Sequence, residues 1–420
     1  MKQTHSIQAA LALLFATGLI GSSLAAELPV GTTISKANLD QVKNDTFEGK
    51  TIASMLPERL EMQIRNYGLN IKLKKTVVTS MDPKSVEATR KYAGEVKYDA
   101  AKNEVSGYKA GLPFPDVKPD DPNYAAKLVW NLYYASPTGQ VMDFKKFAFL
   151  LVDQEKGLER QQNWFFMRYF MKNRLTGSAA PVDGDGSEFT RTLLFATYPQ
   201  DIRGLGTYTI RYDGAQYEDQ WVYIKNARRT RRLAGGAWMD PIGGTDQLND
   251  DIEVWNARPS WYKSYKYVTK RWVLAIANGS RAWDESKKGT ADEFPTVDLA
   301  NAPFWNPKDE WEPREVHVIE ATPPAEHPYS KKTIYIDTQI PRVHFGEAYD
   351  RKGEFWKWMS YSTRAIKGDD GVTNYVSNQG HTLDFKRKHG TVFISHPSWK
   401  TNTAVKADDV TLGKLEAAGQ

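Results

Sequence analysis

The stretch from Trp221 to Trp255 reads WVYIKNARRTRRLAGGAWMDPIGGTDQLNDDIEVW, and it joins an aromatic strand signal to a cluster of arginines. In an extended strand, successive side chains point to opposite faces. Trp221 and Tyr223 therefore share one face, and Val222 and Ile224 share the other. Because both faces are apolar, we predict a sheet that other parts of the protein cover on each side.

Four arginines follow this strand, at positions 228, 229, 231 and 232. If the segment is extended, Arg229 and Arg231 share a face. One interpretation is that these two side chains bind phosphate or carboxylate groups, since guanidinium binds both in a bidentate manner. The other is that the cluster lies on the surface and pairs with the acids that follow it. Those acids are Asp240, Asp246, Asp250 and Asp251.

Strand signals extend in both directions from this stretch. Residues 142–151, 189–198 and 206–212 precede it and are rich in aromatic and β-branched side chains. Residues 265–277 and short segments from 315 to 395 follow it at spacings of roughly 8–12 residues, typical of a sandwich or barrel. Strands and helices do not alternate, so a parallel sheet is not expected. The pattern predicts a mainly β protein, and both a two-sheet sandwich and a curved sheet around a cavity fit it.

One short amphipathic helix is predicted at residues 57–68. Pro57 stands where a helix can begin, Gly68 stands where one can end, and Leu60 and Ile64 lie one turn apart. This helix either packs against the sheet or covers the mouth of a cavity.

The N-terminus has the pattern of a secretory signal peptide over residues 1–26. Lys2 precedes an apolar run from residue 7 to 20, and small residues follow up to Ala26. We therefore expect residues 27–420 to form a single periplasmic domain, soluble after cleavage, with an N-terminal helical segment. The chain has no cysteine, so it can carry neither a lipid anchor on cysteine nor a disulfide.

The composition favours an apolar binding cavity. The chain has 13 Trp, 21 Tyr and 17 Phe, and each aromatic side chain can bury roughly 150–250 Å². The net charge of +5 among 56 basic and 51 acidic residues is too balanced to predict nucleic acid as a partner. Trp356 and Trp358 are expected on one face of a strand, and Arg229 and Arg231 on a polar rim. The candidate cavity wall is Trp221, Tyr223, Trp238, Trp255, Trp356 and Trp358.

No catalytic signature accompanies these residues. The chain has no Gly-x-Ser-x-Gly elbow and no histidine pair with metalloprotease spacing, so neither an enzyme, a metal nor a cofactor is predicted. The run from Gly243 to Asp246 lacks the lysine of a phosphate loop and reads as a turn. Paired carboxylates together with many aromatics leave polysaccharide binding or glycoside cleavage as the alternative function. The pairs are Asp250-Asp251, Asp369-Asp370 and Asp408-Asp409.

Three ordered blocks of the chain resemble a known group. They are Gly111-Leu112-Pro113-Phe114-Pro115, then Trp221-Val222-Tyr223 leading into Arg228–Arg232, and then Arg314–Thr322 with His327–Lys332. On these blocks the chain resembles the uncharacterised periplasmic family of outer-membrane lipoprotein-sorting-like proteins, related in fold to the carrier LolA and its receptor LolB. Tyr133-Tyr134 departs from the pattern, since a basic residue is expected there.

The resemblance implies a fold and a function. The implied fold is a half-open curved antiparallel β-barrel with a few helices covering the mouth and a hydrophobic cavity inside. The implied function is that of a non-enzymatic periplasmic carrier in envelope transport, which binds a hydrophobic or amphiphilic, lipid-like ligand. The implied partners are an inner-membrane exporter of the resistance–nodulation–division type and an outer-membrane protein. A protein that stabilises such a complex without carrying cargo is a further alternative.

Overall fold

The computed structural model describes residues 25–420. Residues 1–24, which hold nearly all of the expected signal peptide, lie outside the described residues. Strands account for 38% of the chain and helices for 18%, which confirms the predicted mainly β class. Within residues 25–420, no helix is both long enough and apolar enough to cross a membrane.

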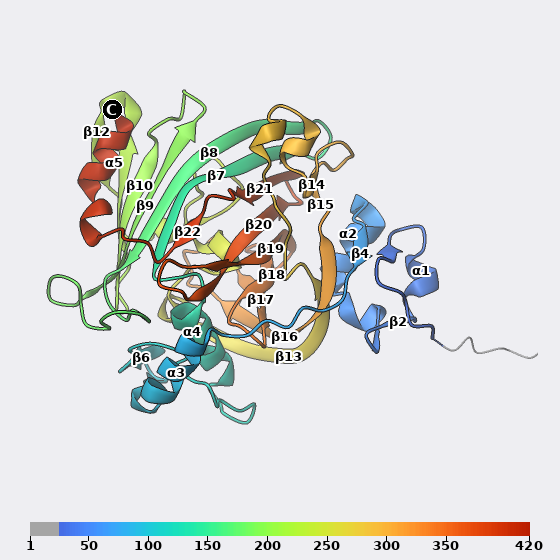
Figure 1. Cartoon of the computed structure of the whole chain (residues 1–420), viewed down its shortest axis with the longest axis horizontal. Helices are drawn as coiled ribbons and strands as arrows, with labels where there is room; N and C mark the ends of the chain where they lie inside the picture. The colour runs from blue at the N-terminus through green and yellow to red at the C-terminus, as the bar shows by residue number, and fades with distance from the viewer. Residues whose placement is uncertain (1–24) are drawn as a thin grey trace, which may run out of the picture.

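A large curved sheet dominates the structure (Figure 1). Two strands pair beside its main path: the long β13 (Ser264–Ala275) with β16, and the short β22 (Lys400–Thr401) with β7. Three two-stranded pairs lie outside it: β2 (Thr46–Phe47) with β3 (Lys50–Thr51), β5 (Lys97–Asp99) with β6 (Glu104–Ser106), and β14 (Val297–Asp298) with β15 (Asn306–Pro307). The main path runs β1 (Thr33–Ile34), β4 (Ile71–Leu73), β16 (Glu310–Thr322), β17 (Lys331–Asp337), β18 (Val343–Tyr349), β19 (Phe355–Lys367), β20 (Thr373–Asp384), β21 (His389–Ser395), β7 (Val141–Asp153), β8 (Gly157–Phe170), β9 (Glu188–Tyr198), β10 (Gly206–Tyr212), β11 (Asp219–Ile224) and β12 (Arg229–Arg232).

The sheet is open and almost entirely antiparallel. Among its described strands, only β4 and β16 pair in parallel, with Lys72 opposite Glu310 and Leu73 opposite Trp311. The terminal strands β1 and β12 do not pair with each other, so the described strands form no closed barrel. The expected antiparallel arrangement is therefore wrong only for β4, because this strand reaches the sheet from the N-terminal segment and not through a hairpin.

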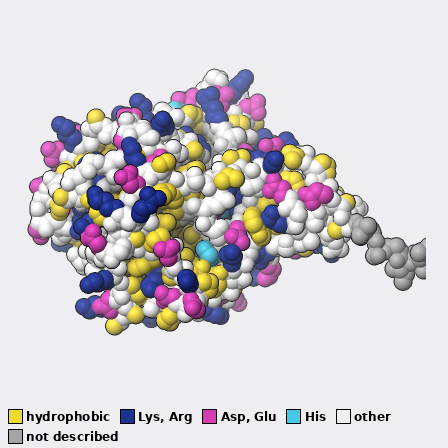
Figure 2. All heavy atoms as spheres, turned by 60° about the horizontal axis from the view of Figure 1, so that its bottom comes forward, with side chains coloured by type: hydrophobic (Ala, Val, Ile, Leu, Met, Phe, Trp, Pro, Cys, Tyr) yellow, Lys and Arg dark blue, Asp and Glu magenta, His cyan; other side chains and the backbone are white. Residues whose placement is uncertain are grey.

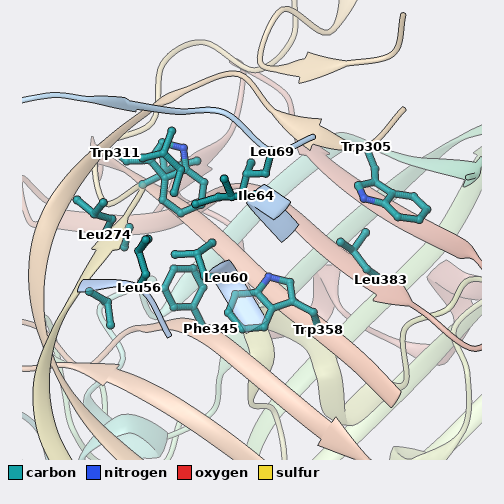
Figure 3. Packing of buried hydrophobic residues seen from close by; sticks show 14 of the residues in the cluster. Leu56, Leu60, Ile64, Leu69, Leu274, Trp305, Trp311, Phe345, Trp358 and Leu383 are labelled. Carbon is teal, nitrogen blue, oxygen red and sulfur yellow. The ribbon is translucent and has the colours of Figure 1, made fainter. Parts of the chain in front are cut away.

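The predicted helix at residues 57–68 is α2 (Glu58–Tyr67), which follows Pro57 and ends at Gly68. Gly68 has φ +66°, a left-handed conformation that glycine adopts without steric cost. Leu60 and Ile64 are fully buried in one cluster with Phe345 and Trp358, and Figure 3 shows Leu60 beside these two rings. The helix therefore packs against the sheet. The other helices are α1 (Leu39–Val42), α3 (Pro83–Tyr92), α4 (Tyr124–Ala135) and α5 (Leu412–Gly419).

The part of the sheet from β7 to β11 is covered on both faces, as the sequence predicts. The C-terminal helix α5 lies against β9, β10 and β11 (Figure 1), and Leu415 packs in one cluster with Met167 and Tyr223. We call the opposite side the inner face. It carries Phe166 and Arg168, which alternate with Met167 along β8.

The segment that follows β12 covers the inner face. We call residues 237–257 the cover segment; it contains two short 3-10 turns, η4 (Ala237–Met239) and η5 (Asn249–Val254). Its turn η5 contacts β18, β19 and β20. Ile242 and Ile252 of the cover segment pack with the phenylalanines of β7. The stretch that joins the aromatic strand to the acidic residues thus lies across the inside of the sheet.

Candidate functional site

An apolar cavity lies between the inner face of the sheet and the cover segment. Its volume is about 70 Å³. Its polar lining groups are few: Arg168, Gln247, Glu253, Tyr361 and Ser377. Its apolar lining is Met142, Phe144, Phe147, Phe149, Phe166, Leu194, Ile242, Ile252, Phe393 and Trp399. A cavity of this composition favours a ligand with a large apolar part.

Three further cavities adjoin the apolar one. Two of them, of about 60 Å³ and 30 Å³, share Arg168 with it. A third, of about 240 Å³, shares Leu194 and Ile242 with it and is bordered by the exposed Asp240 and Pro241. Together these form one cavity system, which runs along the inner face and reaches the protein surface.

Arg168 stands where three of these cavities meet. Its Nε donates a hydrogen bond to Thr192 Oγ1 at 3.2 Å, and its guanidinium lies 5.2 Å from the ring of Phe166. Among residues 25–420 no carboxylate lies within 4.0 Å of it, and its two terminal nitrogens have no hydrogen-bond partner. Burial, together with the positive charge of Arg211, lowers the pKa of Arg168 to about 10. The side chain is therefore a cation at neutral pH.

The other charged groups that line the three cavities around Arg168 form ion pairs with one another. Arg211 donates to Glu218 Oε2 from Nε at 3.0 Å and from Nη2 at 2.7 Å. Arg342 donates to Glu253 at 2.9 Å. Three guanidinium groups thus face two carboxylates, and the excess positive charge is that of Arg168.

Glu253 reaches the cavity from a strained piece of backbone. Glu253 has φ +54° and Val254 has φ +72°, and a positive φ is rare for a β-branched residue. Val254 is fully buried against Gly346, where an added Cβ would lie 2.4 Å from Val254 Cγ1. Ser377 Oγ also donates to Glu253, at 2.8 Å. Packing and hydrogen bonding together hold this conformation, of a kind that often marks functional sites.

Buried charges anchor the cover segment to the sheet. Asp250 and Asp251 are fully buried, and Lys332 Nζ lies 3.2 Å from the first carboxylate and 2.8 Å from the second. Tyr262 donates to Asp250 at 2.6 Å, and Tyr329 donates to Asp251 at 2.7 Å. Burial opposes ionisation of Asp250, but the Lys332 ammonium lowers its pKa below the ordinary value. This ion cluster fixes the position of η5 over the cavity.

The arginines of residues 228–232 do not pair with the acids of the cover segment, so that prediction is wrong. Arg232 instead forms an ion pair with Asp219 of the neighbouring strand. Asp246 accepts hydrogen bonds from Thr391 Oγ1 at 2.9 Å and from the Arg387 guanidinium at 3.1 Å. The acids belong to the anchoring of the cover segment, because that segment turns away from β12 and crosses the sheet.

The predicted wall residues lie in three different clusters. Trp221 and Tyr223 pack beneath α5, on the face opposite the cavities, and Trp358 packs beneath α2. Trp238 and Trp255 are part of the cover segment itself and pack in a third cluster, which includes Tyr262 and Tyr329. Of the six predicted rings, Trp255 alone borders one of the four cavities described above.

The polar rim residues lie away from the apolar cavity as well. Arg229 and Arg231 are exposed on the edge strand β12, opposite Ile224 and Val222 of β11. They share a face, as predicted. Val222, not Trp221, borders a cavity, namely the one that reaches the surface.

Trp356 and Trp358 do not share a face, contrary to the prediction. The register of β18 and β19 shifts between Lys357 and Phe355, so Trp356 lies in a β-bulge. Trp358 is buried beneath α2, whereas Trp356 packs on the cluster that contains Trp238 and Trp255.

Sequence reasoning missed Arg168 and the phenylalanines of β7. One signal was present: residues 164–170 read WFFMRYF, and Arg168 is the single charged residue of this aromatic stretch. A charge in such a strand calls for an internal partner or a ligand. Within residues 25–420, no group of histidine and carboxylate side chains is arranged to hold a metal ion.

The fold and the site define a mainly β protein whose open sheet and cover segment flank an apolar cavity, at the edge of which Arg168 has no ion-pair partner among the described residues. The chain belongs to the family described as Protein of unknown function (DUF1329), whose model matches residues 33–413. The expected membership in an uncharacterised family is thereby confirmed. Comparison with proteins of curated function gave no match.

Several solved structures are distantly similar. A putative outer membrane lipoprotein-sorting protein domain from Vibrio parahaemolyticus has 13% identity and a TM-score of 0.45, over 66% of this chain and 92% of that one. A DUF1329 family protein from Desulfovibrio piger has 15% identity and a TM-score of 0.43, with the same coverage. A LolA superfamily protein from Nitrosomonas europaea has 13% identity and a TM-score of 0.40, over 69% and 98%. These identities are too low to transfer a ligand to this chain.

Proposed function

We propose that this protein is a non-enzymatic periplasmic carrier that binds a hydrophobic or amphiphilic, lipid-like ligand. The observation that carries the proposal is the apolar cavity between β7–β9 and the cover segment. Removing apolar ligand surface from water there contributes roughly 25 cal/mol per Å². A preformed cavity with few polar groups suits binding and release without chemistry.

The setting of this function is part of the same proposal. The signal-peptide pattern at residues 1–26 supports export, and residues 27–420 would then act as one domain in the periplasm. The ligand would pass between this carrier, an inner-membrane exporter of the resistance–nodulation–division type and an outer-membrane protein. In this proposal the curved sheet acts as a half-open barrel, and the ligand enters through its open side.

No observation favours glycoside cleavage. Asp250 and Asp251 are buried and held by Lys332, so they do not face an open cleft. Asp370 accepts hydrogen bonds from Asn402, and Asp409 accepts one from the backbone of Lys406. Each acidic pair thus has a member committed to holding the fold.

Ligand extraction and probe binding test the proposal. Purified protein is extracted with organic solvent for lipid analysis and titrated with a fluorescent apolar probe, N-phenylnaphthylamine. We expect co-purified amphiphile and saturable probe binding, both lost in Phe149→Asp because a charge then enters the apolar cavity. The matched control is Val268→Asp, at an exposed position of β13, which should bind normally. Absence of both amphiphile and probe binding in the native protein would overturn the carrier function.

A further inference from the structure

We infer that the ligand carries an anionic head group, a carboxylate or a phosphate, and that Arg168 binds it. This inference rests on the proposed carrier function and adds the chemical class of the ligand. It is carried by one juxtaposition: a guanidinium without an ionic partner at the junction of an apolar cavity and two polar ones.

The position of Arg168 separates the two parts of such a ligand. On one side lie Phe147, Phe149 and Trp399, which offer a dry surface for an acyl chain or ring system. On the other side lie polar cavity walls that include Thr190 and Asn256. A head group at Arg168 would contact the polar walls while its chain remained in the apolar cavity.

The charges of the cavity system favour an anion over a neutral or cationic head. Glu218 and Glu253 each form an ion pair with another arginine, and neither lies within ion-pair distance of Arg168. A partly buried cation with free N–H donors is unfavourable unless an acceptor reaches it, and a carboxylate or phosphate can accept two of its hydrogen bonds at once. One more carboxylate, that of Asp240, borders the fourth cavity. Its side chain is exposed at the protein surface.

The same geometry gives Arg168 a role distinct from that of the arginines on β12. Arg229 and Arg231 are exposed, so water competes with any anion they bind. Arg168 is partly buried beside a mainly apolar cavity, where a charge-assisted hydrogen bond is stronger than in water. Selectivity for the head group should therefore depend on residue 168 and not on the arginine cluster.

Four probes with the same alkyl chain test the inference. Dodecanoate, dodecyl phosphate, dodecanol and dodecylammonium are each used at neutral pH, below their micelle concentrations, to displace N-phenylnaphthylamine from the native protein. We expect the two anions to bind at least about tenfold more tightly than dodecanol, as a hydrogen bond to a charged group implies. Dodecylammonium should bind most weakly. Comparison of the two anions distinguishes a carboxylate from a phosphate ligand.

Variants connect the preference to the residue. In Arg168→Gln the anions should bind no more tightly than dodecanol, whereas Arg168→Lys should keep part of the preference because it keeps the charge. Arg231→Gln on β12 is the matched control and should behave as the native protein. Circular dichroism checks that each variant folds. If Arg168→Gln does not fold, the test rests on the head-group preference of the native protein and on its reduction in Arg168→Lys.

The outcomes separate the two claims. If none of the four probes binds to the native protein, the carrier function itself is overturned. If dodecanol or dodecylammonium binds as tightly as dodecanoate and dodecyl phosphate, the carrier function stands and the anionic head group is refuted. A full preference for anions in Arg168→Gln would likewise refute the role of Arg168.

Discussion

Replacing Lys332 by Met should destabilise the protein strongly, because it removes the cation that anchors the cover segment. Lys332 is fully buried and contacts two fully buried carboxylates, those of Asp250 and Asp251. Methionine has a similar length, so the main loss is the charge. Leaving buried charges without their partner costs about 3–5 kcal/mol, and here two carboxylates lose the same cation.

The measurement is urea unfolding of the native protein and the variant, followed by tryptophan fluorescence. The control is Lys331→Met at the neighbouring position, where a half-exposed ammonium lies 2.9 Å from Glu320. That exposed pair should contribute only about 0–1 kcal/mol. A second variant adds Asp250→Asn and Asp251→Asn to Lys332→Met, and it should recover part of the loss because no buried charge remains.

The pH dependence gives an independent check of the same reasoning. In the native protein the pKa of Asp250 is lowered, so its contribution to stability is present above the ordinary value of 3.8 and is lost as pH falls through the lower folded value. Without Lys332, burial raises the pKa of the same group, and stability is then lost as pH rises. The difference between native protein and variant should therefore shrink toward acid pH. A loss below about 1 kcal/mol at neutral pH, or a difference unchanged at acid pH, would refute the anchoring role.

Three further predictions concern the cavity and its cover. Gly346→Ala should destabilise the protein by about 1–3 kcal/mol in urea unfolding, because the added Cβ would lie 2.4 Å from Val254 Cγ1. A loss of stability below about 0.5 kcal/mol would contradict this packing. Arg168→Met should stabilise the ligand-free protein by roughly 1 kcal/mol, because it removes a charge without a partner. Its thermal midpoint in calorimetry should therefore rise, and a lower midpoint would count against this explanation. The hydrogen bond to Asp246 raises the pKa of His389 above 6.5, so its stabilisation is present below that pH and lost as pH rises through the higher folded value. His389→Gln should flatten this part of the stability profile, and an unchanged slope would exclude the contribution.

The sequence was sufficient to predict local features and insufficient to place them. The alternation of Trp221, Val222 and Tyr223 predicts a strand with two covered faces, and α5 and the cover segment do cover them. Periodicity does not say which face borders the cavity, because both faces are apolar. The larger rings were expected to line it, yet they pack beneath α5, where a short helix needs bulky partners.

Long-range pairing explains the other differences. Asp250 and Asp251 meet Lys332 of β17 only because η5 lies across β18, β19 and β20, and no local sequence pattern contains that placement. Trp356 leaves the face of Trp358 because of a bulge, which adds one residue without a clear sequence signature. The sequence shows Arg168 as the single charged residue of the aromatic stretch 164–170. Whether a carboxylate of residues 25–420 pairs with it depends on the fold.

The pairing of β7 with β21 has a consequence for how the chain folds. These two strands lie near the middle of the sheet and join residues 147–153 to residues 389–395. Ordering so long an intervening chain before such contacts form makes folding slow. Until the last strands are available, β7 presents an unpaired edge rich in phenylalanine, and such edges promote aggregation. We therefore expect this protein to depend on a holding chaperone between its synthesis and its final compartment, and chains that lack residues after about 385 to accumulate as aggregates.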